Sequence, residues 1–438
     1  MIGKMIDRNF WTKTLTLLLA IGFMCAASGC SKEEMNAIID QIKQTNLGAA
    51  PSSAPENAQF ELSDLNDRVT AAQTQFALNL FHAVHNNADP ADNLFLSPYS
   101  IAAALAMTAN GAADETLTEM QQTLQMHGLS LEEMNRGYQV LTDLLAHSGE
   151  EVKVSIANSL WAREGLSFHD AFLENVRTYY DAEVTSLNFQ SDAAANRINA
   201  WVHKQTRGKI PSIIDGPIPG DAILYLLNAI YFEANWAKPF REEATKTKPF
   251  ALPDGSKKEV PMMVNSGQFQ YLEGDGFQAI RLPYQGHRMS MLVFLPDQNS
   301  NLEQLISKLT ADQWKEWLDS FARASGALEM PRFKLEFETS LKETLEQMGM
   351  KTAFHPQAAQ FSNMISLSEN VYLKDAKHKA YIEVEEKGTV AAAVTSIEAG
   401  AASAPAKTFQ MIVDRPFFFA IHDQGTDAIL FMGTVTNP

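Results

Sequence analysis

The stretch Ile223-Leu224-Tyr225-Leu226-Leu227-Asn228-Ala229-Ile230-Tyr231-Phe232, followed by Trp236 and by Pro239-Phe240, decides the fold class of this chain. The run is short, almost wholly apolar and rich in β-branched and aromatic residues, and Gly220-Asp221 precedes it. Such a short apolar run, bounded by Gly and Asp, is typical of a β-strand.

Other segments show the same strand signature, and all of them come later in the chain: residues 290–295, 334–337, 380–384, 417–421 and 429–435. The N-terminal part reads differently. Apolar residues recur at helical spacing through 64–85, and a Ser-Pro pair precedes a small-residue apolar helix at 100–110. Helices first and strands later predict an α+β fold in which helices pack on a largely antiparallel sheet.

Composition excludes several classes of protein. The 438 residues are 45% hydrophobic and 20% charged, which suffices for a sizeable core and argues against disorder. The net charge is −17, from 52 acidic and 35 basic residues, so a nucleic-acid partner is not expected. The two cysteines, Cys25 and Cys30, lie too near the N-terminus for a disulfide between them to stabilise the domain that follows.

Residues 1–29 are predicted to be a signal peptide. Lys4, Arg8 and Lys13 precede an apolar stretch that, as a helix, covers roughly 20 Å and so falls short of the ~30 Å hydrocarbon core. Ala27-Ser28-Gly29-Cys30 resembles the bacterial lipoprotein box, in which the cysteine is acylated. We accordingly expect an exported protein anchored by Cys30 to a bacterial membrane. The outer membrane and the cell surface are the two alternatives for its location. An ordinary signal with an incidental cysteine is the alternative.

The segment that follows is expected to be a tether. Residues 45–59 read TNLGAAPSSAPENAQ, rich in small residues and Pro with almost no hydrophobic periodicity. Residues 30–59 thus join the lipidated cysteine to a single domain, residues 60–438, which shows no internal repeat.

Several motifs in this domain resemble one family, the serpins, whose members trap proteases by inserting a cleaved loop into a central sheet. The resemblance runs from about Val69 to Pro438 and rests on Asn93-Leu94-Phe95-Leu96-Ser97-Pro98-Tyr99-Ser100-Ile101, Asn228–Phe232 with Trp236, Thr206-Arg207-Gly208-Lys209-Ile210, Asp414-Arg415-Pro416-Phe417-Phe418-Phe419 and Phe431-Met432-Gly433. It implies the serpin fold, with a large central sheet, smaller sheets and an exposed reactive-centre loop at about 386–407. It also implies a region that governs opening of the sheet: Ser97, Ser100, Asn228, Trp236 and His378. Plain satisfaction of buried polar groups is the other interpretation of these residues.

Residues 385–395, EEKGTVAAAVT, are similar to the hinge of inhibitory serpins. An inserted strand sends alternate side chains into the core, and one face of this segment, beginning Thr389, Ala391, Ala393, Thr395, is small or apolar throughout. No Pro occurs between Gly388 and Ser403, so every inserted residue keeps its N–H. The hinge residues predicted on this basis are Glu386, Gly388, Thr389, Ala391, Ala392, Ala393 and Thr395. A flexible linker or an Ala-rich helix is the alternative, because Ala favours helices.

The resemblance also locates the bond to be cleaved. Inhibitory serpins usually place it sixteen residues beyond the second hinge glutamate, here Glu386, which gives Ala402-Ser403. A methyl side chain at Ala402 suits elastase-like or subtilisin-like serine proteases, because a trypsin-like pocket would leave its carboxylate unpaired. Inserting about fifteen residues at ~3.3 Å each would carry the acylated protease some 50 Å.

Suicide inhibition of a serine protease, with a papain-like cysteine protease as a further partner, is therefore the predicted function. The chain is expected to be a monomer and not an enzyme, without cofactor or metal, since no nucleophile elbow, phosphate loop or metal-binding motif occurs. A non-inhibitory serpin-fold surface lipoprotein acting as a binding module is the alternative function. That alternative tolerates charges or prolines in the part of the hinge that inserts, and residues 388–395 have neither.

Overall fold

In the computed structural model the described residues are 59–149, 152–365, 371–389 and 408–438, and nine α-helices occur among them. These are α3 (Asp67–Asn87), α4 (Pro98–Ala109), α5 (Asp114–Thr123), α6 (Leu131–Ala146), α7 (Asp170–Tyr180), α8 (Asp192–Gln205), α9 (Leu302–Ser307), α10 (Ala311–Ser320) and α11 (Lys342–Gln347). Short 3₁₀ turns occupy Leu62–Asp64, Glu242–Ala244 and Thr352–Phe354. The helices expected at 64–85 and 100–110 are α3 and α4. None of the helices described is long and apolar enough to cross a membrane.

Helix α4 is buried along its whole length, as expected for a helix that is apolar on nearly every side. Its first turn is held by Ser97, whose side chain accepts a hydrogen bond from the Ser100 backbone N–H, and Pro98 takes the first helical position, where its missing N–H costs nothing. Helix α4 packs against strands β4 and β2. It therefore covers one face of the sheet described next.

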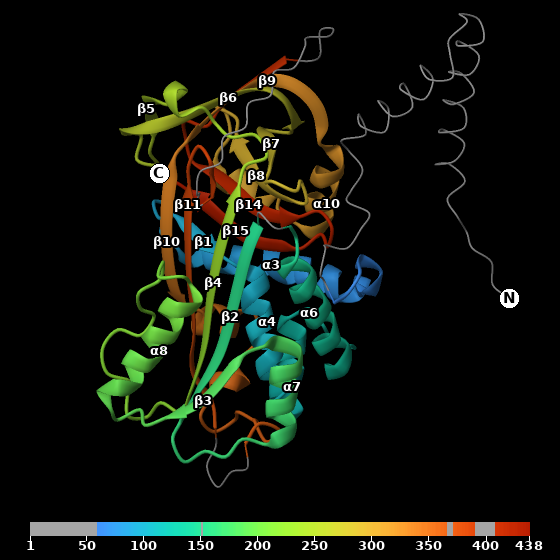
Figure 1. The fold of residues 1–438 in the computed structure, drawn as a ribbon, viewed down its shortest axis with the longest axis vertical. Coiled ribbons are helices and arrows are strands. Elements are labelled where there is room, and N and C mark those ends of the chain that lie inside the picture. Colours follow the sequence, from blue (N-terminus) through green and yellow to red (C-terminus); the bar gives the residue numbers. More distant parts are fainter. Residues whose placement is uncertain (1–58, 150–151, 366–370, 390–407) are drawn as a thin grey trace, which may run out of the picture. The chain divides into compact units, whose positions relative to one another are not determined.

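A six-stranded sheet carries the strand from which the sequence argument began. Its order is β10 (Phe333–Ser340), β11 (Leu373–Val384), β12 (Gly388–Thr389), β4 (Leu224–Asn235), β2 (Val152–Arg163) and β3 (Glu183–Leu187). The pairings β11–β4 and β2–β3 are parallel and the others antiparallel. Figure 1 shows β4, β2 and β11 running alongside one another. The α+β class is confirmed.

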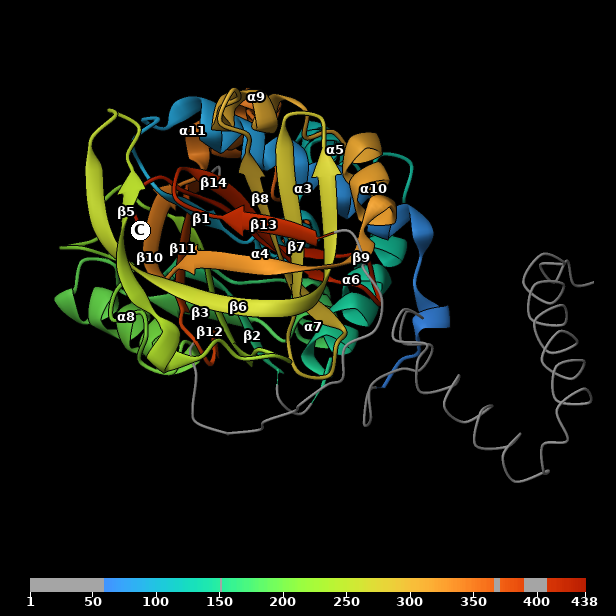
Figure 2. The same ribbon diagram turned by 90° about the horizontal axis from the view of Figure 1, so that it is seen from above.

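A nine-stranded sheet also packs against helix α4. Figure 2 shows this sheet from above. Its path is β1 (Leu94–Leu96), β15 (Ile429–Val435), β14 (Phe417–Asp423), β8 (Met289–Pro296), β7 (Phe277–Pro283), β6 (Lys257–Gly274), β9 (Ala322–Pro331) and β13 (Thr408–Ile412), with β5 (Lys246–Ala251) paired to β6. All five strands predicted from residues 290–295, 334–337, 380–384, 417–421 and 429–435 are present, as β8, β10, β11, β14 and β15.

The two faces of the six-stranded sheet are covered by different hydrophobic clusters. Even-numbered residues of β4, such as Ile230 and Phe232, join the main core around α4. Odd-numbered ones, such as Leu227 and Ala229, join a second cluster that includes Ile198 on α8. We call these the inner face and the outer face. Because both faces are covered, β4 is apolar along most of its length.

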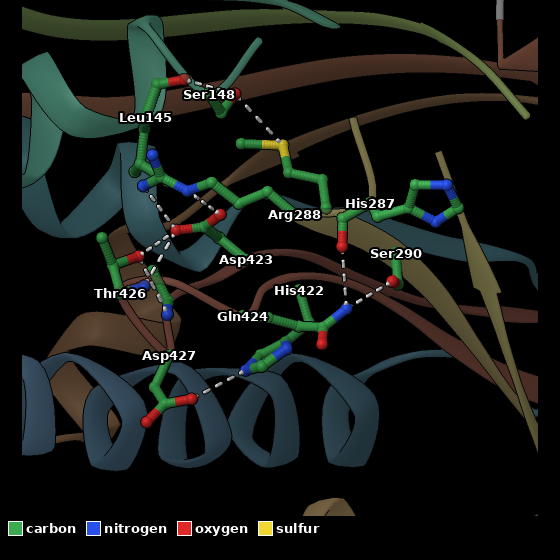
Figure 3. A network of polar contacts seen from close by, with 12 residues as sticks. Leu145, Ser148, His287, Arg288, Ser290, His422, Asp423, Gln424, Thr426 and Asp427 are labelled. Atoms are coloured by element: carbon green, nitrogen blue, oxygen red, sulfur yellow. Dashed lines mark hydrogen bonds and ion pairs between the residues drawn. The ribbon is translucent and has the colours of Figure 1, made fainter. Parts of the chain in front are cut away.

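A buried ion pair ties two turns of the nine-stranded sheet together (Figure 3). The Arg288 guanidinium donates to both carboxylate oxygens of Asp423, at 2.7 and 2.9 Å, and the same carboxylate accepts from the N–H and hydroxyl of Thr426. His422 lies beside this pair, with its Nε2 3.7 Å from an Asp427 carboxylate oxygen. Burial is the main cause that lowers the pKa of His422, to about 3.

Candidate functional site

A tight turn links β11 to β12 at one end of the six-stranded sheet. Glu385 N donates to Gly388 O at 2.9 Å, and Gly388 N donates to Glu385 O at 3.2 Å. Thr389 then pairs antiparallel with both neighbours, Val384 of β11 and Ala234 of β4. The first residues of the predicted hinge therefore stand as a short strand between β4 and β11.

Below this point β4 and β11 are direct neighbours. They pair in parallel from Leu224 with Leu373 to Ile230 with Ala380. We call this boundary the seam. Strands in a sheet lie about 4.8 Å apart, so a strand that entered the seam would have to move β4 and β11 apart by one such spacing. The arrangement is thus a sheet whose central position is filled at one end and closed along the rest.

Gly388 is required at its position because of close contact with β4. A Cβ on this residue would lie 2.2 Å from the carbonyl oxygen of Ala234 and 2.7 Å from the Cα of Asn235. Both atoms belong to backbone and cannot rotate away. The structure therefore gives a steric reason for the glycine, namely that β12 approaches β4 too closely for any side chain.

Two stacked aromatic rings contact the turn between β11 and β12 and hold it in place. Trp236 and Tyr284 lie 4.5 Å apart between ring centroids and nearly parallel. The indole N–H of Trp236 donates to Glu385 O at 2.9 Å, and its backbone N–H donates to Lys387 O at 2.9 Å. The Tyr284 hydroxyl shares a 2.8 Å hydrogen bond with the hydroxyl of Thr389, which is wholly buried. Thr389 therefore points to the inner face.

Glu386 is a buried carboxylate with strong partners. It is 3% exposed and accepts from the Thr245 hydroxyl at 2.6 Å and from the Arg332 guanidinium at 2.5 Å. Burial by itself raises the pKa of Glu386, but these two hydrogen bonds, a backbone hydrogen bond and the charge of Arg332 together outweigh burial and leave the pKa below its ordinary value. A backbone bond from Phe240 N to Glu386 O, 2.8 Å long, completes the attachment. The hinge is thus fastened by charge as well as by strand pairing.

A second polar group lies under the middle of the seam. His378 of β11 and Asn228 of β4 are paired residues, and their side chains bond across the seam at 2.7 Å. The Asn228 amide also accepts from the Ser100 hydroxyl and donates to the Asn158 side-chain oxygen, both at 2.7 Å. Ser97 N donates to the other ring nitrogen of His378 at 3.2 Å. Helix α4 and three strands are therefore joined through one asparagine.

These partners determine the protonation of His378. Its Nε2 accepts from a backbone N–H, so the proton sits on Nδ1, which donates to Asn228. Complete burial lowers the pKa of His378 to about 3, and the ring is neutral at neutral pH. Every separation of β4 from β11 at this level must break the His378–Asn228 hydrogen bond.

The matching family model agrees with this architecture. Residues 71–438 match the family described as serpin (serine protease inhibitor). The chain belongs to the serpin family. Human leukocyte elastase inhibitor is 34% identical over 390 residues, which cover 85% of this chain and all of the relative. Mouse antithrombin-III is 31% identical over 405 residues, 90% of this chain and 86% of the relative. These relatives support protease inhibition as the general activity of the family to which this serpin belongs.

Solved structures agree as well. The native state of a thermophilic serpin, tengpin, matches this serpin with a TM-score of 0.79 and 32% identity, over 85% of this chain and 95% of that one. The match to human thyroxine-binding globulin, solved with its hormone, has a TM-score of 0.77 and 30% identity, over 84% and 98% of the two chains. The serpin fold is therefore shown on sequence and on structure.

The residues that the sequence assigned to sheet opening fall in two places in this serpin. Ser97, Ser100, Asn228 and His378 lie together under the seam. Trp236 is apart from them, under the hinge turn. Glu386, Gly388 and Thr389 form that turn and β12, whereas Ala391, Ala392, Ala393, Thr395, Ala402, Ser403 and Cys30 lie outside the described residues.

Sequence reasoning missed four residues that complete these two groups: Asn158, Tyr284, Thr245 and Arg332. Asn158 is the β2 residue paired with Asn228. Arg332 and Thr245 are surface types in loops that only the fold brings to Glu386. Nothing in their local sequence marks them.

Proposed function

We propose that this serpin is a suicide inhibitor of serine proteases with elastase-like or subtilisin-like specificity. The carrying observation is β12, where Thr389 is already paired between β4 and β11 with its hydroxyl turned inward. Continuing the same antiparallel register sets Ala391 between Phe232 and Ile382. Each further pair of loop residues would enter the seam as β4 and β11 separate.

The chemistry belongs to the protease until insertion begins. Its serine oxygen attacks the Ala402 carbonyl, the bond to the Ser403 nitrogen breaks, and that nitrogen leaves with a proton from the protease histidine. An ester to Ala402 results. Insertion then draws the ester and the protease away from the cleavage site, and a displacement of even 1 Å in the catalytic groups costs about 10² in the rate of hydrolysis.

The small hinge side chains support inhibition over the binding-module alternative. The seat of residue 391 lies between two side chains that are at most 1% exposed, so it admits a methyl group far better than a charge. The leukocyte elastase inhibitor is, by its name, directed at an elastase, which agrees with an alanine before the bond. Lipid anchoring through Cys30 and export to a bacterial membrane are part of the same proposal and rest on the N-terminal sequence.

The decisive experiment mixes residues 60–438 with an elastase-like protease and with a trypsin-like one. We expect a complex that survives boiling in detergent with the first protease only, and a released C-terminal peptide that begins at Ser403. Cleavage at this bond without any complex would support the binding-module alternative. A peptide beginning elsewhere would show that the register of the bond is wrong.

A further inference from the structure

The turn after α8 is a rigid platform that projects two cations over the outer face of the six-stranded sheet; Figure 1 shows α8 beside β4. Arg207 and Gly208 are both left-handed, with φ of +51° and +81°. Gly208 N donates to His203 O at 2.7 Å, which closes the helix end. Ile210, wholly buried, anchors the far side of the turn. Arg207 and Lys209 consequently hold a fixed spacing.

Arg207 reaches β4. Its guanidinium lies 3.6 Å from a Glu233 carboxylate oxygen and 5.6 Å above the ring of Tyr231. The Tyr231 hydroxyl donates to the same carboxylate oxygen at 2.8 Å. One arginine thus contacts a tyrosine–glutamate pair on the strand that borders the seam.

Lys209 reaches β11 in the same way. Its ammonium lies 3.6 Å from a Glu383 carboxylate oxygen and 5.3 Å from the centre of the Tyr381 ring. The Tyr381 hydroxyl donates to that carboxylate oxygen at 2.6 Å. The contacts on β11 therefore repeat those on β4: in each case a cation of the turn contacts a tyrosine ring and the glutamate two residues further along the strand.

These two tyrosine–glutamate pairs face each other where the seam ends. Direct pairing of β4 with β11 stops at Ile230 and Ala380, immediately before Tyr231 and Tyr381. Three residues further along, β12 stands between the strands. Arg207 and Lys209 therefore act at the point where β4 and β11 begin to part.

We propose that Arg207 and Lys209 form a clasp across the seam that resists entry of the loop. Entry adds one strand spacing of about 4.8 Å between β4 and β11. Residues 207–209 form one short turn and cannot move with β4 and with β11 at the same time. At least one of the two ion pairs, Arg207–Glu233 or Lys209–Glu383, must therefore break. Two exposed ion pairs on separate elements would contribute little, but here they are coupled through the turn. The contacts of the clasp are those of the uncleaved protein. Its effect on loop entry rests on the proposed function, in which the cleaved loop inserts into the sheet.

Lys153 and Lys334 provide the contrast. Lys153 of β2 lies 3.0 Å from a Glu233 carboxylate oxygen, and Lys334 of β10 lies 5.2 Å from the Tyr381 ring. Each comes from the strand beside the one it contacts and so stays on one side of the seam. Lys153→Gln therefore removes an ion pair to the same glutamate, a shorter one, without crossing the seam.

Hydrogen exchange in the uncleaved protein tests the clasp directly. In Arg207→Gln/Lys209→Gln we expect the amides of 231–234 and 382–384 to exchange about five- to thirtyfold faster than in the wild type. Each single variant should give most of this effect on both strands, since a turn that contacts only one of the two strands no longer joins them. Lys153→Gln should leave β11 unchanged, and about 0.5 M salt should bring the wild type toward the double variant.

Additive single effects, each confined to the strand contacted, would overturn the clasp, as would unchanged exchange in the double variant. A second measurement follows the gain in thermal stability after the loop is cut, which should be faster in the double variant by a similar factor. If the cut wild type gains no stability, insertion itself is wrong, and the exchange data still decide whether the clasp exists.

Discussion

Replacing Ala391 with arginine makes the sharpest demand on the insertion mechanism. If the register of β12 continued on insertion, residue 391 would lie between Phe232 and Ile382, which are 1% and 0% exposed. The Phe232 ring packs against Tyr284 and Phe431 at centroid distances of 5.1 and 5.8 Å. A guanidinium in this seat has no carboxylate to pair with.

The expected cost follows from the seat. Burying a charge without a partner costs several kcal/mol even after local relaxation. If about 3 kcal/mol of this is present when residue 391 enters the seam, insertion slows by roughly a hundredfold. Hydrolysis of the ester then wins, so Ala391→Arg should be cleaved at the same bond as the wild type, release active protease and form little stable complex.

Ala392→Arg is the matched control. The same register places residue 392 between Tyr231 and Tyr381 on the outer face, one step from the carboxylates of Glu233 and Glu383. Inhibition should stay close to that of the wild type. The assay is the ratio of detergent-stable complex to cleaved serpin at equal protease. Equal trapping by the two arginine variants would refute insertion with alternating faces.

Three other expectations can be checked independently. Cys30→Ser should release the protein from the membrane fraction or block its processing, and unchanged fractionation together with an unchanged mature mass would contradict the anchor. Ala402→Arg should bring trypsin-like proteases into the complex and exclude elastase-like ones, as read on detergent gels. Gly388→Ala should lower the urea-derived unfolding free energy by about 1–3 kcal/mol, because the added carbon meets backbone; an unchanged midpoint would dispose of the close-contact argument.

Acid should destabilise the fold through its buried histidines. The pKa values of His378 and His422 are both lowered to about 3, chiefly by burial, so below pH 6.5 the unfolded chain binds more protons than the native one. Stability is therefore fully present above pH 6.5 and declines by about 1.4 kcal/mol per pH unit for each histidine down to about pH 3. His378→Asn should reduce the slope in urea titrations between pH 7 and 4.5; an identical slope would contradict this.

The fold class was readable from the sequence because burial leaves a direct trace in the order of residues. The apolar run through Ile230 predicted a strand, and the structure shows that strand as β4, with a hydrophobic cluster on each face. The Ser97-Pro98 pair predicted a helix start and supplies one. Strand β2 escaped prediction, since its N-terminal half alternates only weakly between buried and exposed residues.

The alternating pattern of the hinge was also a property of the sequence alone, since small residues at every second position need no partner to be recognised. Its register was not. Only pairing with Ala234 and Val384 says which of the two faces turns inward, because a shift of one residue would reverse them.

The tertiary structure alone decided which polar residues meet. Glu386 finds Arg332 and Thr245, and Arg207 meets Glu233, across separations in the chain that no local pattern spans. Exposed and half-buried charges carry no periodic signal, so their partners are settled by how sheets and helices pack. The sequence predicted a segment able to join this sheet as a strand, and only the packing showed which polar residues meet beside β4 and β11.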